Sequence, residues 1–212
     1  MVHSLLKQVF RGQADTTLRG LREGLRDRTK DDNPLKQTSF DFNVYQQTKL
    51  SSGKRLTIDA DDVEEFLEHK KGGFCFLLLT MLYPDLKVDQ ISFHQDHMHP
   101  HSGFNTTALK AMGLDEQTIE HWQHLRDQLP NLQLLEGQEN TQKQATPLCT
   151  WLANNATDPQ YYRERNYIDE HQSLKLEDFE VFFQVRKQLL RNKLYQIFNV
   201  ALAKESTEVA EA

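Results

Sequence analysis

The stretch FHQDHMHPHSGF, residues 93–104, places four histidines, an aspartate and a proline within one short segment, although the 212-residue chain has only nine histidines. The overlapping segment QISFHQ (90–95) alternates and is β-branched near its start, which predicts a short strand. Adjacent strand residues face opposite ways, so Asp96 and His97 can share a site only if the strand ends or bends there. Pro100, just beyond, agrees with such an end.

A second segment, NLQLLEGQENTQK (131–143), follows some thirty residues later. NLQLL (131–135) predicts a short extended piece, and Asn140 then begins a helix that carries Lys143 three residues on. The sequence therefore offers a strand that ends in Asp-His, a second strand and a helix, in that order.

The rest of the chain is mostly helical by its pattern. One apolar stripe near the C-terminus repeats at helical spacing over more than twenty residues. It consists of Phe179, Phe182, Phe183, Leu189, Leu190, Leu194, Ile197, Phe198 and Ala201. Further helices are expected over 3–28 with a break near Gly12, over 60–70, over 73–83, over 105–114, from Asp115 to about 129, and over 137–155 with a break near Pro147. The pattern predicts a mostly α fold of the α+β class.

Composition restricts the classes of function. Apolar residues make up 38% and charged residues 26% of the chain, a balance typical of water-soluble globular proteins. No apolar run is long enough to cross a bilayer, and the N-terminus has no signal-peptide pattern, so we expect a cytoplasmic protein. Cys75 and Cys149, the only cysteines, favour a reducing compartment and exclude a four-cysteine zinc site. A net charge of −6 argues against indiscriminate nucleic-acid binding.

The layout of DHMHP (96–100) with NLQLLEGQENTQK (131–143) resembles the HNH, or ββα-metal, nuclease finger, in which two short strands and a helix hold one divalent cation. The residue types suit phosphodiester hydrolysis. Histidine can act as a base near neutral pH, and a cation can counter the charge of the phosphate and of the departing oxygen. Mg²⁺ prefers oxygen ligands, which Asp and Asn supply.

The resemblance implies a role for each matched residue. Asp96 and Asn140 bind the metal, Mg²⁺ or Mn²⁺, and His97 is the general base. Asn131 matches the middle Asn, which braces the loop between the strands. Lys143 matches a helix lysine near the phosphate and is expected, with His97, to be a catalytic residue.

The resemblance extends along nearly all of the chain to the C-terminal half of GmrSD-type restriction endonucleases, which are modification-dependent nucleases of phage defence. The segments that carry it, in order, are QADTTLRGLRE, LTIDADDVEEFLEHKKG, LLLTMLYP, FHQDHMHPHSGF, NLQLLEGQENTQKQATPLCTWL and YYRERNYI. The N-terminal ParB-like domain of that family has no counterpart here. We therefore expect a helical segment and linker over 1–36, a helical HNH nuclease domain over 37–204 with the finger at about 90–152, and a polar tail over 205–212.

Simpler interpretations stand beside these. His94, His99 and His101 fit solvated loop residues, or with His97 a transition-metal site. Asn131 and Asn140 fit turn and cap residues, and Lys143 a solvated helix residue. Three basic runs could face DNA or could be the wet faces of helices. These runs are Arg19, Arg22, Arg26 and Arg28; Arg163 and Arg165; and Arg186, Lys187, Arg191 and Lys193.

The sequence as a whole predicts a metal-dependent DNA endonuclease. The alternative is a non-catalytic binding or assembly module that works only with a separate ParB-like partner. DNA is the expected partner, and because the net charge is negative, contact with it has to come from local basic patches, helped by a cation.

Overall fold

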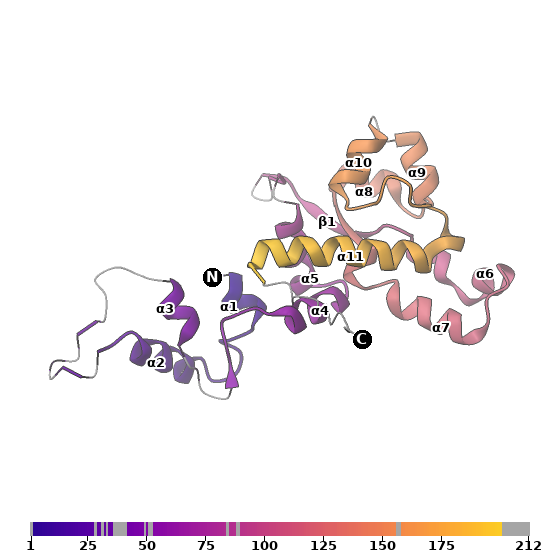
Figure 1. Ribbon diagram of the computed structural model, residues 1–212. Helices are drawn as coiled ribbons and strands as arrows, with labels where there is room; N and C mark the ends of the chain where they lie inside the picture. Colours follow the sequence, from indigo (N-terminus) through magenta and orange to yellow (C-terminus); the bar gives the residue numbers. More distant parts are fainter. Residues whose placement is uncertain are drawn as a thin grey trace, which may run out of the picture. The chain divides into compact units, whose positions relative to one another are not determined.

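The chain divides into two compact units, Met1–Asp59 and Ala60–Ala212, in the computed structural model (Figure 1). The structure describes residues 2–27, 29–30, 32, 34–35, 42–48, 50, 53–83, 85–87, 90–155 and 158–200. The division falls at Asp59, whereas the sequence placed a boundary after residue 36. The expected polar tail, 205–212, lies outside the described residues.

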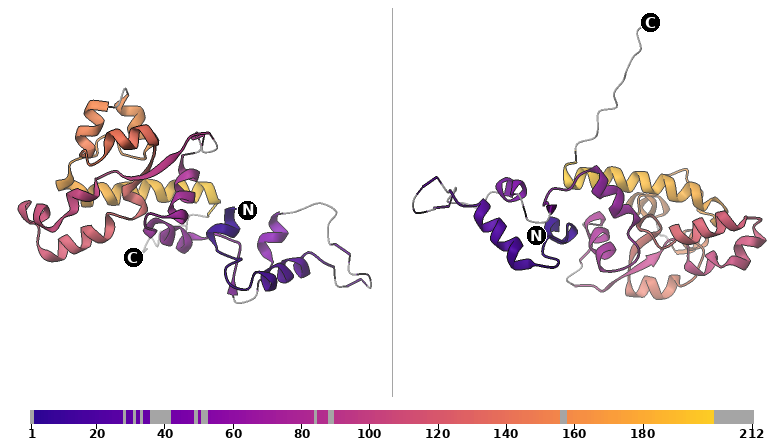
Figure 2. Two further views of the ribbon diagram at one scale, coloured as in Figure 1. Left: turned by 180° about the vertical axis from the view of Figure 1, so that it is seen from behind. Right: turned by 90° about the horizontal axis from the view of Figure 1, so that it is seen from below.

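In its described residues, the N-terminal unit contains the short helices α1 (Val2–Leu6), α2 (Ala14–Gly24) and α3 (Phe42–Gln47) (Figure 2). The predicted break lies between α1 and α2 at Gly12, whose φ of +85° is readily adopted only by glycine. A small apolar cluster holds the unit together and consists of Val9, Leu21, Leu50 and Leu56, with Tyr45 against it. The sequence missed α3.

The C-terminal unit is helical around one two-stranded sheet, so the predicted mostly α, α+β class is confirmed. The predicted helices over 60–70, 73–83, 105–114, 115–129 and 137–155 are present with shorter bounds, the last as the two helices α8 and α9, and α10 was not predicted. The elements are α4 (Ala60–Glu68), α5 (Gly73–Leu82), β1 (Phe93–His97), α6 (Thr106–Ala111), α7 (Glu116–Leu125), β2 (Leu132–Glu136), α8 (Gly137–Lys143), α9 (Leu148–Asn155), α10 (Pro159–Arg165) and α11 (Phe179–Phe198). In the part of the chain that the structure describes, no helix is long and apolar enough to span a membrane.

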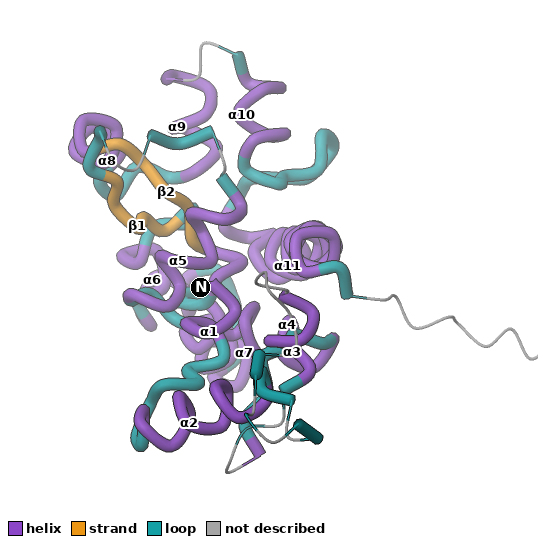
Figure 3. The backbone as a smooth tube through the Cα atoms, turned by 90° about the vertical axis from the view of Figure 1, so that its left-hand side faces the viewer, coloured by secondary structure: helices purple, strands orange, loops and turns teal. Residues whose placement is uncertain are grey.

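The sheet pairs β1 with β2 in antiparallel register, from Phe93 opposite Glu136 to His97 opposite Leu132 (Figure 3). Helix α8 begins directly after β2 and contacts both strands. Helices α6 and α7 occupy the long connection between the strands, together with the 3₁₀ turns His101–Phe104 and Leu129–Asn131. Two strands alone are marginal in water, so the sheet depends on the helices around it.

Helix α11 organises the core of this unit, and α4, α5 and α7 pack against it. Its first two turns bury Phe179, Phe182 and Phe183, as the apolar stripe predicted. These rings join a cluster from α6, α7 and α9, from the segment between β1 and α6, and from the segment between α10 and α11. The other members of the cluster are Met98, Phe104, Leu109, Ile119, Trp122, Leu125, Leu148, Leu152, Ile168 and Leu174.

The same helix carries a buried cation. Arg186 is only 1% exposed. It therefore neither faces DNA nor lies on a solvent-exposed side of the helix, and both interpretations that the sequence allowed are wrong for this residue. Its guanidinium donates to the carbonyl oxygens of Asn166 at 2.8 Å and Pro130 at 2.6 Å, and more weakly to that of Leu129 at 3.4 Å. The Tyr83 hydroxyl lies 3.4 Å from it, and no carboxylate pairs with it among the described residues. Burial lowers the pKa of Arg186, and the backbone carbonyls serve as its partners in place of an anion.

We predict that Arg186→Met destabilises the protein. Methionine removes the cost of burying a charge, but it leaves the carbonyls of Pro130 and Asn166 without a donor, at about 1–3 kcal/mol for each buried group. We expect a loss of roughly 2–4 kcal/mol in the free energy of unfolding, measured by urea denaturation. Lys193→Met, on the half-exposed side of the same helix, is the control. Greater stability of Arg186→Met than of wild type would show that desolvation outweighs these hydrogen bonds.

Candidate functional site

Asp96 and His97 end strand β1 and face different partners. The Asp96 carboxylate lies 2.7 Å from the Lys143 ammonium of α8 and accepts from the Gln133 amide of β2 at 3.1 Å. The His97 ring lies 2.9 Å from the Asp127 carboxylate, in the loop after α7. The alternation of side chains along a strand is therefore kept to the end of β1, so the two side chains point to opposite faces and the strand end does not bring them into one site, as the sequence analysis required.

Lys143 joins the helix to the strand. Its side chain is fully buried, and its ammonium donates to the His97 carbonyl oxygen at 2.7 Å in addition to its bond with Asp96. Burial lowers the pKa of Lys143, while Asp96 acts in the opposite direction. The interpretation of Lys143 as a solvated helix residue is therefore wrong. The lysine neutralises Asp96 and holds α8 against the end of β1.

Asp127 fixes the orientation of His97. Burial lowers the pKa of His97 and outweighs the hydrogen bond to Asp127, which raises it, so the ring is neutral at pH 7. Burial also acts to raise the pKa of Asp127, but its contacts with His97 and Arg126 prevail and lower it, so the group is a carboxylate. A carboxylate only accepts hydrogen bonds, and the Nε2 atom of His97 must therefore be the donor.

This assignment leaves the Nδ1 atom of His97 as the basic nitrogen. No hydrogen bond to Nδ1 is present among the described residues, and Nδ1 is not one of the buried polar atoms that lack a partner. Nδ1 therefore keeps some solvent exposure, although the His97 side chain as a whole is only 13% exposed. A neutral histidine with one nitrogen fixed by a carboxylate and the other partly exposed to solvent can take a proton from a water molecule.

Asn131 braces the connection between the strands, as the sequence predicted. It is completely buried, and its side-chain oxygen accepts from the His99 amide at 3.0 Å. Its side-chain nitrogen donates to the carbonyl oxygens of Arg126 at 2.7 Å and His99 at 3.2 Å. All three bonds are to backbone, so Asn131 fixes the chain on both sides of the segment that carries Asp127.

Asn140 lies inside α8 and neither begins nor caps it, because the helix starts at Gly137 and its N-cap is Glu136. It is one turn before Lys143 and so lies on the same side of the helix as Lys143. Its side chain is partly exposed and forms no hydrogen bond among the described residues. Asp96 and Asn140 thus offer a carboxylate and an amide oxygen from neighbouring elements. Such a set suits Mg²⁺, which keeps several waters and needs only one or two protein ligands beside the phosphate oxygens of a substrate.

Of the remaining histidines of the 93–104 segment, His101 lies close to His97, whereas His94 and His99 have other neighbours. His99 is 1% exposed, and its ring packs edge-on against Phe179 and Phe182, so the solvated-loop interpretation is wrong for this residue. His94 is exposed beside Gly137, and His101 is exposed with its ring centroid 5.8 Å from that of His97. Within the described residues, no three or more His, Cys, Asp or Glu side chains form a group that could hold a metal.

The sequence analysis missed Asp127 and Gln133. Gln133 lies between the site and the interior: its nitrogen donates to Asp96 and its oxygen accepts from the Tyr162 hydroxyl at 2.9 Å. Gln133 is the variable position of the Asn-Leu-x-Leu-Leu pattern, and Asp127 lies at the end of a helix with no spacing signal of its own. Only the folded chain brings either residue to the strand end.

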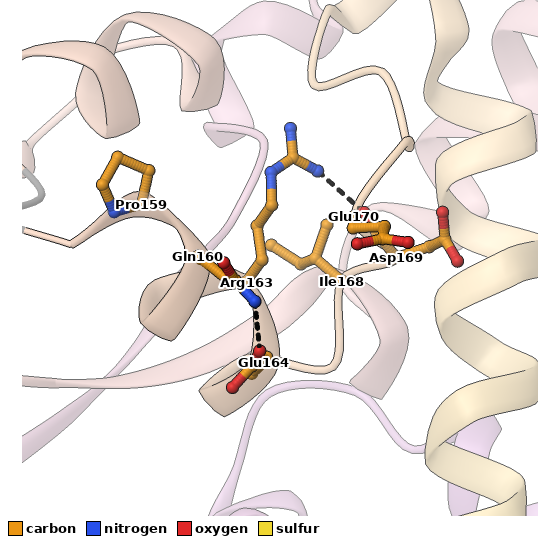
Figure 4. A pocket seen from close by; sticks show the side chains of 7 residues that line it. All are labelled: Pro159, Gln160, Arg163, Glu164, Ile168, Asp169 and Glu170. Atoms are coloured by element: carbon orange, nitrogen blue, oxygen red, sulfur yellow. Dashed lines mark hydrogen bonds between the residues drawn. The ribbon is translucent and has the colours of Figure 1, made fainter.

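Two surface pockets of about 500 Å³ each lie elsewhere in the unit. One is formed by α10 and the loop after it, where Arg163 donates to the Asp169 carbonyl oxygen and Gln160 to Glu164 (Figure 4). The other is lined by residues 85–87, by Ile91, by the strand residues Phe93 and Glu136, and by residues of helices α8 and α10. Neither pocket is lined by Asp96 or His97.

No protein-family model matches the chain, and no curated protein matches it either. The site therefore has to be interpreted from its own geometry.

We predict that His99 makes the stability depend on pH. Burial lowers its pKa to about 3, against about 6.5 in an unfolded chain. Between these two pKa values the unfolded state binds a proton and the folded state does not. The contribution of His99 to the free energy of unfolding is therefore complete above pH 6.5 and is lost as the pH falls toward 3. We expect wild type to lose about 2 kcal/mol between pH 7 and pH 5 through this group. His99→Met should lack this component, and the exposed His171→Gln should keep it.

Urea denaturation of the three proteins across this range measures the effect. Parallel pH profiles for wild type and His99→Met would contradict it.

Proposed function

We propose that the chain is a metal-dependent DNA endonuclease of the HNH type, which hydrolyses phosphodiester bonds. It acts in the cytoplasm as the nuclease part of a modification-dependent restriction or phage-defence system. The observation that carries the proposal is the end of β1. A neutral His97 is held there by Asp127, and the preceding residue, Asp96, is directed to the other face of the strand, toward Lys143 of α8, the helix that also carries Asn140. The order of strand, strand and helix agrees with the resemblance of the sequence to GmrSD-type nucleases.

In this proposal His97 supplies the base. The Nδ1 atom of His97 accepts a proton from water as that water attacks the phosphorus, and Asp127 stabilises the imidazolium that forms. Asp96 and Asn140 are the residues that would hold Mg²⁺ or Mn²⁺. When bound, the cation would counter the charge of the phosphate and of the departing oxygen. Lys143 acts through Asp96, by holding its carboxylate in place.

One observation favours the second candidate, a non-catalytic binding or assembly module. Lys143 already pairs with Asp96, so the carboxylate that should attract a cation is neutralised within the chain. A chain of net charge −6 also has little general attraction for DNA. In this second proposal the chain works by joining a separate ParB-like protein.

Plasmid cleavage distinguishes the two. We expect the purified chain to nick or cut plasmid DNA with Mg²⁺ or Mn²⁺ and to lose this activity in excess EDTA. His97→Ala should lower turnover by about 10²–10⁴-fold, the usual contribution of a general base, with metal affinity near wild type in calorimetry. Asp96→Ala and Asn140→Ala should weaken metal binding as well as rate. Full activity in EDTA, or no cleavage by wild type with either metal, would refute the nuclease.

Asp127→Asn tests the base assignment separately. The amide can donate to the Nε2 atom of His97, which moves the ring proton to Nδ1 and removes the basic nitrogen from the water side. We expect the plateau rate to fall by roughly 10²-fold or more. Loss of the anion also removes an influence that raises the pKa of His97, so the acidic limb of the pH–rate profile should move to lower pH.

Glu120→Gln, an exposed change on α7, removes the same charge away from the site and should leave the profile unchanged. A wild-type pH–rate profile for Asp127→Asn would show that Asp127 has only a structural role.

A further inference from the structure

The outer side of α2 carries arginines that the fold does not use. Arg19 and Arg22 are one turn apart on the exposed side of the helix, and Arg26 follows just beyond its C-terminal end. The opposite side of α2 is buried through Thr17 and Leu21. None of the three arginines forms an ion pair or side-chain hydrogen bond among the described residues. We call these three residues the α2 arginine face.

The other two basic runs of the sequence are largely engaged within the protein. Arg163 donates to the carbonyl oxygens of Asp169 and Gln172, and Arg165 lies 3.6 Å from Asp85 and over the Tyr83 ring. On α11, Arg186 is buried, whereas Lys187 and Arg191 pair with acids of α4. Lys193 is the remaining member of that run. Of the three basic runs, only the α2 arginine face consists of described guanidinium groups without an ion pair or side-chain hydrogen bond within the protein.

Charge is distributed unevenly between the two units. Residues 1–59 contain 11 Lys and Arg against 7 Asp and Glu, a net charge of +4, and residues 60–212 contain 14 against 24, a net charge of −10. The unit that carries the proposed catalytic site therefore repels a polyanion such as DNA. An attraction strong enough to hold DNA has to come from the N-terminal unit, or from a separate partner.

We propose that the α2 arginine face binds the phosphate backbone of double-stranded DNA. The proposal rests on the nuclease function and deepens it, because it names the surface that brings the substrate to a chain of unfavourable net charge. Guanidinium groups bind phosphate oxygens through paired hydrogen bonds, and backbone contacts of this kind carry no sequence information. Arginines one turn apart on a helix can reach successive phosphates of one strand. The binding is therefore independent of sequence and sensitive to salt.

The test is a DNA titration of the full chain in EDTA, where binding is measured without cleavage. A labelled duplex is titrated by fluorescence anisotropy with wild type and with the triple variant Arg19→Gln, Arg22→Gln, Arg26→Gln, at several salt concentrations. The slope of log K against log salt should become shallower by about 0.9 for each arginine that contacts a phosphate. The affinity at low salt should fall accordingly.

The matched control is Lys110→Gln, Lys175→Gln, Lys193→Gln, which removes the same charge from the C-terminal unit. We expect its slope to equal that of wild type. A further variant with lysine at the three α2 positions keeps the charge and should retain most of the salt dependence. Circular dichroism and thermal melting check that the exposed changes leave the fold intact.

The outcomes separate this proposal from the nuclease function. A wild-type slope for the α2 glutamine variant, or equal losses in both glutamine triples, would overturn the α2 arginine face whether or not the protein cleaves DNA. A shallower slope in the α2 variant alone supports the face, even if the wild-type chain then fails to cleave plasmid with Mg²⁺ or Mn²⁺. That second failure would count only against the nuclease.

Discussion

The candidate site depends on one buried ammonium group. Lys143 enters a fully buried position because two oxygens at the end of β1, the Asp96 carboxylate and the His97 carbonyl, receive it there. A buried cation without such partners would be very costly. The pair therefore fixes the position of α8 relative to the sheet, and with it the position of Asn140. The same contact neutralises Asp96, so the bond that builds the site also reduces its attraction for a cation.

The sequence predicted the framework because its signals are local. The apolar stripe from Phe179 onward predicted α11, Gly12 predicted the break after α1, and the Asp-His strand end was expected where β1 ends. Asn131 was expected to brace the loop and does so through three backbone bonds. Each of these depends on residue type and near neighbours. The small helices α3 and α10 lack a comparable apolar period and were missed.

What the sequence could not predict depends on partners distant along the chain. Asp127 reaches His97 across 30 positions, and Arg186 reaches Pro130 across 56. His99 and Lys143 are polar residues that resemble surface residues until the fold supplies oxygens or aromatic rings around them. Burial of a polar group is decided by whether tertiary partners exist, and one sequence does not contain that information. The roles of Asp96 and Asn140 as metal ligands and of His97 as the general base remain predictions.

The long connection between β1 and β2 has a consequence for how such a site can be inherited. Helix α11, which is not part of the strand–strand–helix element, holds this connection in place. Its Phe179 and Phe182 pack on His99, and its Arg186 donates to the carbonyl oxygens of Leu129 and Pro130 just before β2. A segment limited to the two strands and α8 would leave those carbonyls and rings without their partners. The strand–strand–helix element therefore cannot be moved alone into another protein with its site intact. Recombination that preserves the site has to carry the whole C-terminal unit through α11.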